Sequence, residues 1–261
     1  MHRIPILLLL FVSSFKQIPS QELGDFSLNY TYYKGAIIRM DSTQKNIYLF
    51  FTGHEFADGY KTLMDIFNKH KIKGNFFFTG DFYRNQNFAG IINELKNEGH
   101  YLGAHSDKHL LYAPWDNRDS TLVSFEQFSR DVFNNYAEMK KFDITKDDAP
   151  FFLPPFEWFN DTISKWTKQL GLHLTNFTPG TSANQDWSIP ELGKGYYSSD
   201  TIFARILKFE QLNKDGLNGF LLLTHIGTDP RRTDKFYNRL DELITELKRR
   251  GYSFKRLMIE N

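Results

Sequence analysis

The stretch that decides the fold is residues 46–80, which read NIYLFFTGHEFADGYKTLMDIFNKHKIKGNFFFTG. Apolar runs at 46–51 and 74–79 flank a segment in which Leu63, Ile66 and Phe67 recur at helical spacing. Runs without in–out alternation are typical of strands that are buried on both faces of a parallel sheet. The stretch therefore predicts a strand, a helix and a second, parallel strand.

The same alternation continues to the end of the chain. Helical patterns such as residues 124–142 and 234–251 separate further apolar runs. These runs are HYLGA (100–104), PFFLP (150–154), LHLTNF (172–177), GFLLLT (219–224) and YSFKRL (252–257). Seven strands that alternate with helices predict an α/β fold with a parallel sheet, closed as an incomplete or complete (β/α)7 barrel in a single domain over residues 46–258.

The amino-acid composition limits the metal ligands, cross-links and partners that the chain can have. The 261 residues include no cysteine, so disulfides are excluded and any metal must be held by His, Asp or Glu. A net charge of +1 gives no support for a nucleic-acid partner. A basic start followed by an apolar run over residues 4–15 predicts a signal peptide at 1–21 and an exported protein, periplasmic or secreted, without a membrane span after its removal. We expect residues 22–45 to be an irregular lead-in.

Reactive side chains follow the predicted strands at the end where β/α barrels carry their chemistry. These residues are His54, Glu55, Asp58, His105, His109, Glu157, Trp158, Asp186, Trp187 and His225. Because the carboxyl ends of parallel strands meet at one rim, we expect these side chains to converge. Scattered surface polar residues would not favour that rim.

Two pairs within this set suggest specific roles. His105 and His109 are either solvated loop histidines or two metal ligands, since a spacing of four brings imidazoles together on a helical turn. His54 or Asp58 could supply a third ligand. A carboxylate such as Asp186 can orient His225 and raise its pKa, which would make the histidine a general acid. A turn aspartate beside a packing tryptophan is the plain structural alternative.

Several segments of the chain resemble those of a known family. The sequence HSDKH at 105–109 resembles the His-Ser/Thr-x-x-His motif of carbohydrate esterase family 4, the NodB-type polysaccharide deacetylases. The resemblance extends over residues 45–258, where further segments occur in the same order as in that family. These segments are residues 46–80, EGHYLGAHSDKH, FFLPPFEWFN, NQDW and FLLLTHIG. The resemblance implies a distorted barrel and a divalent metal, with zinc the first choice. It also implies hydrolysis of N-acetyl, sometimes O-acetyl, groups on a glycan.

The resemblance implies roles for individual residues. His105 and His109 would bind the metal, Asp186 would orient His225 as the general acid, and Glu55 or Asp58 would be the base. The family's first motif has two adjacent aspartates where this chain has TGHEFADG. We prefer His54 to Asp58 as the third ligand, because the other alignment leaves too short a connection before a helix beginning near Tyr60.

Other departures affect the third motif and the substrate contacts. Leu153 replaces the arginine that steadies the family's catalytic aspartate. Glu157 replaces a small residue and would be a ligand, a base or a substrate contact. Trp158 and Trp187 would form an apolar wall for the sugar or the acetyl methyl group. Two alternatives stay open: a non-catalytic carbohydrate-binding protein on a degenerate scaffold, and an amide hydrolase with a non-sugar substrate.

Overall fold

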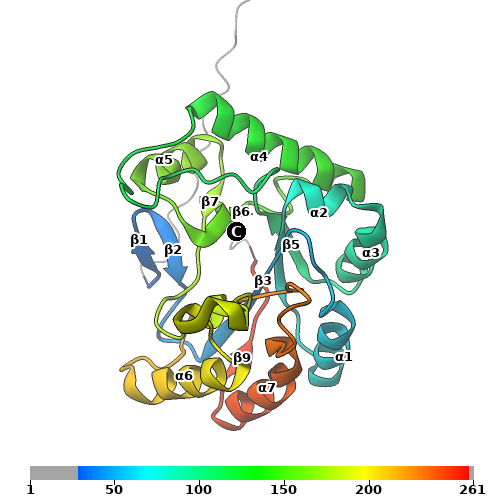
Figure 1. Cartoon of the computed structure of the whole chain (residues 1–261), viewed down its shortest axis with the longest axis vertical. Helices are drawn as coiled ribbons and strands as arrows, with labels where there is room; N and C mark the ends of the chain where they lie inside the picture. Colours follow the sequence, from blue (N-terminus) through cyan, green and yellow to red (C-terminus); the bar gives the residue numbers. More distant parts are fainter. Residues whose placement is uncertain (1–28, 259–261) are drawn as a thin grey trace, which may run out of the picture.

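The computed structural model describes residues 29–258, so the signal peptide expected at 1–21 lies outside the described part (Figure 1). The strands are β1 (Thr31–Tyr33), β2 (Ala36–Arg39), β3 (Asn46–Gly53), β4 (Asn75–Phe78), β5 (Tyr101–Ala104), β6 (Phe151–Phe152), β7 (His173–Leu174), β8 (Phe220–His225) and β9 (Ser253–Phe254). The α-helices are α1 (Tyr60–His70), α2 (Gly80–Arg84), α3 (Ala89–Asn97), α4 (Phe125–Met139), α5 (Asp161–Gln169), α6 (Ser199–Leu212) and α7 (Leu240–Arg249).

Strand β3 lies at the centre of a mainly parallel sheet. The strand order is β1-β2-β8-β3-β4-β5-β6-β7, and β9 pairs with the first two residues of β3. From β8 through β3 to β7 every neighbouring pair is parallel, so their carboxyl ends share one edge, here called the C-terminal rim. The expected distorted α/β barrel in one domain is confirmed.

Strand β2 closes the ring between β8 and β7. Its Arg39 pairs antiparallel with Phe220, while Ile37 forms a parallel bridge to Thr175, just beyond β7. The expectation that residues 22–45 are irregular is therefore wrong for their described part, which holds β1 and β2. The seventh place in the ring belongs to β2, whereas residues 252–257 form the short β9 outside it. A four-residue strand is too short for periodicity to distinguish it from a loop.

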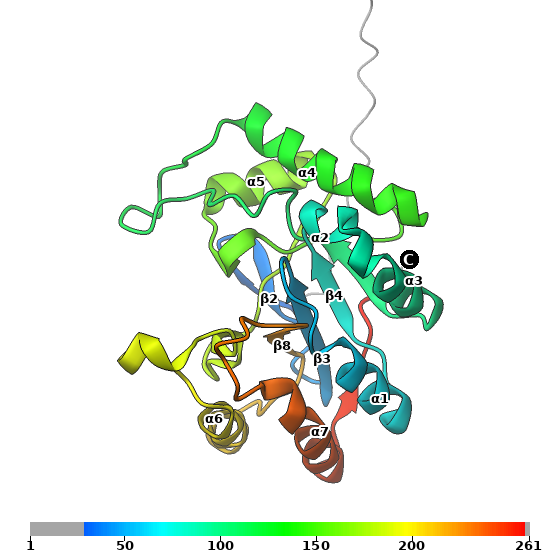
Figure 2. The ribbon, with the colours of Figure 1, turned by 45° about the vertical axis from the view of Figure 1, so that its right-hand side comes forward.

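Aromatic side chains fill both faces of β3. Phe51 packs against Phe67 of α1, with ring centroids 5.6 Å apart. Successive residues of a strand point to opposite faces, so Phe50 and Thr52 point into the barrel. Figure 1 shows the helices surrounding the strands, with α4 and α5 at the top and α1 and α7 at the bottom. Figure 2 shows the long connection from β5 to α4, which extends away from these helices.

Within residues 29–258 no helix combines the length and the apolar character needed to cross a bilayer.

Candidate active site

The histidine motif after β5 is a bend rather than the helical turn that we expected. Ser106 and His109 have positive φ values of 69° and 54°, which a helix does not allow. The backbone N–H of His109 donates to the Ser106 hydroxyl at 2.9 Å. The ring centroids of His105 and His109 lie 5.0 Å apart. The two imidazoles therefore come together through left-handed backbone and a serine hydrogen bond.

Neighbouring helices hold this bend in place. The first N–H of α2 donates to the Ser106 carbonyl at 2.9 Å. From α4, Asn135 accepts from the backbone N–H of His105 at 2.9 Å, and Asp131 accepts from that of Lys108 at 3.1 Å. The loop has little freedom, because both its ends and its middle are bonded to rigid elements.

One tautomer of His105 is fixed by its hydrogen bond. Its Nδ1 lies 2.9 Å from the carbonyl oxygen of Leu153, which can only accept, so Nδ1 carries the hydrogen and Nε2 the lone pair. A backbone carbonyl on the second ring nitrogen is typical of metal-binding histidines. Leu153 thus contributes its carbonyl where the resembled family has an arginine side chain.

His105 and His109 are held as neutral imidazoles. Burial and then the neighbouring His109 lower the pKa of His105 well below its usual range. Burial, followed by the charges of His54 and His225, lowers the pKa of His109 to about 3. Neutral imidazole is the form that binds metal ions.

His54 completes a group of three imidazoles. Its Nδ1 lies 3.0 Å from the Thr79 hydroxyl, and its ring stacks on that of His109 with centroids 5.1 Å apart and planes 15° apart. We call His54, His105 and His109 the histidine group. Across residues 29–258 no three His, Asp or Glu side chains form a ready-made metal site. The in-plane lone pairs of two stacked rings lie in nearly parallel planes and do not meet at one point, so the donors suit a metal chemically but one ring would have to turn.

Asp58 is engaged outside the histidine group. Its Oδ1 accepts from the Thr228 backbone N–H at 2.8 Å, and its Oδ2 accepts from the Tyr237 hydroxyl at 2.8 Å and lies 2.9 Å from the Lys235 ammonium. Burial alone would raise the pKa of Asp58, but these donors outweigh it and lower that pKa. Both oxygens of Asp58 therefore tie the loop after β3 to the segment after β8.

Glu55 lies at the solvent edge of the site. Its side chain is 67% exposed, and one carboxylate oxygen is 3.9 Å from His54 Nε2. Glu55 is therefore near the histidine group without being enclosed by it.

Asp186 and His225 form the pair that the sequence predicts. The ring Nδ1 of His225 donates to Asp186 Oδ1 at 2.6 Å, so Nε2 takes no part in this bond. Burial alone would lower the pKa of His225, but the charge and hydrogen bond of Asp186 outweigh it and raise that pKa. His225 pairs in register with Thr52 of β3, two residues before His54, so the pair and the histidine group lie at the same rim.

Exposed aromatic rings extend outward from His109. The Phe156 ring lies 4.3 Å from that of His109, and Trp115, 59% exposed, lies 5.7 Å beyond Phe156. Trp158 supports them: Trp115 packs against it at 5.2 Å, and the Arg118 guanidinium lies 3.9 Å from its ring centroid. We call Trp115, Phe156 and Trp158 the aromatic platform. Of its three members only Trp158 was expected. A tryptophan among proline and turn residues, as in YAPWDN, is the signal that could have revealed Trp115.

Comparison with known proteins identifies the family. The family model described as polysaccharide deacetylase matches residues 39–175. The chain belongs to the polysaccharide deacetylase family. It is 30% identical over 220 residues to the peptidoglycan-N-acetylmuramic acid deacetylase of Bacillus subtilis, covering 82% of this chain and 71% of that protein. It is 24% identical over 192 residues to a peptidoglycan-N-acetylglucosamine deacetylase of Bacillus cereus, covering 74% of this chain and 76% of that protein.

A solved structure adds a likeness of fold. A family 4 carbohydrate esterase pseudoenzyme from Bacillus anthracis matches with a TM-score of 0.65 at 17% identity, covering 87% of this chain and 68% of that chain. The expected family and the expected enzyme class, a hydrolase of carbon–nitrogen bonds in glycans, are therefore confirmed.

Trp187, which directly follows Asp186 in the chain, contributes to a second apolar surface. Its exposed side chain lines a hollow of about 450 Å³. The other lining residues are Phe56, Ile189, Leu192, Gly227, Thr228, Asp229 and Arg231. Because Asp186 and Ile226 flank this hollow in sequence, a ligand in it would lie beside His225.

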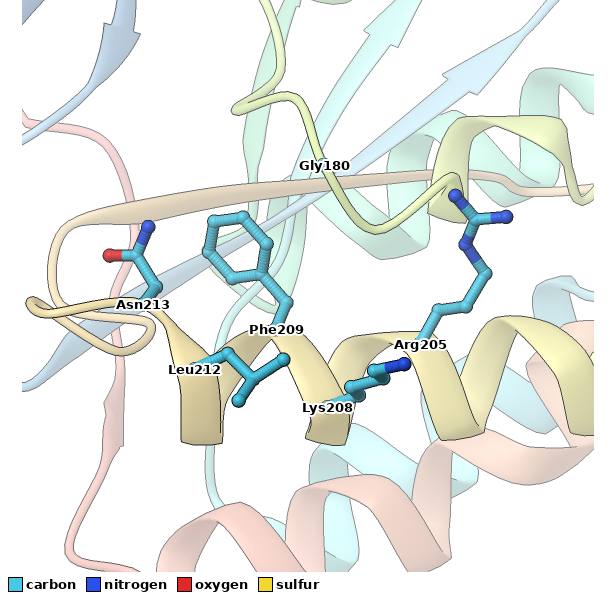
Figure 3. Close-up of a pocket in the computed structure, with 6 residues that line it drawn as sticks. All are labelled: Gly180, Arg205, Lys208, Phe209, Leu212 and Asn213. Carbon is cyan, nitrogen blue, oxygen red and sulfur yellow. The ribbon is translucent and has the colours of Figure 1, made fainter.

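A further hollow of about 520 Å³ lies along α6 of the deacetylase fold (Figure 3). In Figure 3 Arg205 and Phe209 reach from the helix toward the loop at Gly180. It is lined by Gly180, Arg205, Lys208, Phe209, Leu212 and Asn213, which include none of the predicted site residues. This hollow is therefore separate from the chemistry described above.

Proposed function

We propose that the chain is an exported, metal-dependent deacetylase that hydrolyses N-acetyl groups of a glycan. The observation that carries this proposal is the meeting of two chemical units at one rim of the barrel. In the histidine group the His109 ring lies 5.1 Å from that of His54 and 5.0 Å from that of His105, and Asp186 holds the imidazole of His225 by a hydrogen bond. Metal ligands and a general acid are the two units that amide hydrolysis of this kind requires.

The histidine group would hold a divalent ion, with zinc the first choice because imidazole nitrogens suit it and no thiolate is available. When bound, such an ion polarises a carbonyl and lowers the pKa of a water molecule. His105 is the best prepared of the three, because Leu153 already fixes its tautomer.

His225 would protonate the departing amine. Its Nδ1 hydrogen is committed to Asp186, and the raised pKa keeps the second proton on Nε2 to a higher pH than in an ordinary histidine. A proton delivered there prevents the amine from leaving as an unstable anion. The base that accepts the proton of the attacking water is a carboxylate of the same site, and Glu55 and Asp58 were the two expected candidates.

A glycan substrate is supported by the exposed aromatic rings on both sides of the site. Trp115 and Phe156 continue outward from His109, and Trp187 lies beside the acid pair. Flat apolar rings can cover the apolar face of a sugar. The named relatives act on peptidoglycan, which makes peptidoglycan the first substrate to test. Release of O-acetyl groups is the secondary reaction to examine.

The test is acetate release from peptidoglycan fragments and chito-oligosaccharides by the metal-loaded protein. We expect release that stops on chelation and returns with zinc. Binding of these glycans without release would instead support the carbohydrate-binding alternative, which the absence of the adjacent aspartates favours. Release of acetate only from non-sugar amides would support the third alternative.

A further inference from the structure

The backbone at Glu157 is held in an unusual conformation. After β6, Phe156 and Glu157 have positive φ values of 58° and 53°. The N–H of Glu157 donates to the Pro154 carbonyl at 3.1 Å, and Asn176 donates to the Glu157 carbonyl at 2.7 Å. Two consecutive non-glycine residues with positive φ cost free energy, and such strain is retained where a side chain must be aimed.

The carboxyl group of Glu157, which this turn orients, is enclosed but accepts no hydrogen bond from a described residue. Among residues 29–258 no hydrogen bond to the Glu157 carboxyl is present, although the side chain is partly exposed and so open to water. Burial raises the pKa of Glu157 to about 7; the charge of His225 opposes this rise and that of Asp186 adds to it. Glu157 therefore shares one electrostatic environment with the His225–Asp186 pair.

The other two carboxylates are less suited to remove a proton. Asp58 uses both oxygens in bonds to the Thr228 N–H, the Tyr237 hydroxyl and the Lys235 ammonium. Glu55 is largely surrounded by water, so the site neither encloses its carboxylate nor fixes its direction. Glu157 is the carboxylate that is both enclosed and unoccupied.

We propose that Glu157 is the general base of the deacetylation, in place of a carboxylate from the loop after β3. The inference rests on the proposed function. As the water oxygen bonds to the acetyl carbon, Glu157 takes one proton from that water. The C–N bond then breaks, its electron pair stays on nitrogen, and Nε2 of His225 supplies the proton that completes the amine. Acetic acid leaves, Glu157 returns its proton to solvent and His225 takes one up, so one water is consumed per acetyl group.

The decisive comparison is Glu157→Gln against Glu55→Gln and Asp58→Asn, with acetate release from chito-oligosaccharides and peptidoglycan fragments as the assay. We expect Glu157→Gln to lower kcat by about 10²–10⁴-fold with KM and bound zinc unchanged. A loss of kcat of this size in Glu55→Gln or Asp58→Asn, with wild-type kcat in Glu157→Gln, would assign the base to the loop after β3 instead. Retention of kcat in Glu157→Gln would overturn the proposal. Loss of zinc from that variant would also overturn it, because Glu157 would then be a ligand.

A second variant guards against misfolding of the first. Glu157→Ala leaves room for formate, a small carboxylate, and we expect added formate to restore turnover in a concentration-dependent manner. Failure of formate to restore any turnover in a folded Glu157→Ala protein would count against the base role. A wild-type protein that releases no acetate would refute the proposed function itself, whereas an active wild type with an active Glu157→Gln would refute this inference alone.

Discussion

One carboxylate controls both the side chain and the main chain of a histidine in this fold. Asp186 Oδ1 lies 2.6 Å from Nδ1 of His225, and Asp186 Oδ2 lies 3.0 Å from the backbone nitrogen of the same residue. Rotation of the ring and displacement of the strand end are therefore opposed by the same group. This arrangement suits an acid that must meet a leaving nitrogen in one orientation.

Replacing Asp186 by Asn should move the alkaline limb of the pH–rate profile to lower pH. The raised pKa of His225 keeps the imidazolium present at higher pH, and activity is lost as pH rises through that pKa. Without the negative charge the imidazolium loses its proton earlier. The measurement is kcat against pH for acetate release, with the exposed Asp143→Asn as control. An unmoved alkaline limb would show that His225 does not act through Asp186.

The zinc content of two variants should show whether His105 and His109 bind the metal. We expect His105→Ala and His109→Ala each to lose most of the bound zinc, because each change removes one neutral imidazole donor. Elemental analysis after dialysis is the measurement. His70→Ala is the matched control, since His70 pairs with Asp241 at the end of α1 and should leave the zinc in place. Full zinc in both motif variants would refute the ligand assignment.

We expect His54→Ala to affect zinc content and Asp58→Ala to affect stability when the two variants are compared. The first should reduce zinc content with little change in stability, since the His54 ring is partly exposed. The second should keep zinc but lower the free energy of unfolding by about 1–3 kcal/mol, because Tyr237 loses its acceptor and Lys235 loses its ion-pair partner. Denaturant unfolding and elemental analysis measure the two effects. The reverse pattern would make Asp58 the third ligand.

Trp115→Ala should weaken binding of long glycans only. Trp115 lies outward of His109 and Phe156, so a single sugar held at the site would not reach it. We expect a higher KM for long chito-oligosaccharides and an unchanged KM for the shortest one that is hydrolysed. Phe133→Ala, which removes an exposed aromatic ring on α4, serves as control. Equal effects on short and long substrates would remove Trp115 from the binding surface.

Glu157→Gln should change how stability depends on pH. The pKa of Glu157 is raised from 4.5 to about 7, so its contribution is fully present below 4.5 and is lost as pH rises through about 7. Relative to the wild type, the variant should therefore gain melting temperature with rising pH across this range. Thermal unfolding against pH measures this, with the exposed Glu55→Gln as control. A constant difference at all pH values would mean that the pKa of Glu157 is not raised.

The sequence allowed prediction of elements that depend on local pattern. The runs that became β3 and β8 are apolar at nearly every position and are buried as expected. The pairing of Asp186 with His225 could also be anticipated, because both residues follow strands that end at the same rim. Local pattern and barrel geometry together were sufficient in these cases.

Features that depend on distant partners could not be predicted in the same way. The carboxylate of Asp58 is occupied by Lys235 and Tyr237, which lie near the other end of the chain. The enclosure of Glu157 depends on positive φ angles that residue preferences do not suggest for phenylalanine or glutamate. In both cases tertiary contacts determine whether a carboxylate is available for chemistry.

Strand β2 matters for any attempt to shorten the protein from its N-terminal side. The Ile37 carbonyl accepts from the backbone N–H of Asn176 at 2.8 Å, and the side chain of Asn176 in turn donates to the Glu157 carbonyl. A shortened gene that begins at residue 46 would keep every predicted metal and acid residue. It would nevertheless leave β7 and β8 with unpaired edges, and it would remove the Ile37 carbonyl to which Asn176 donates.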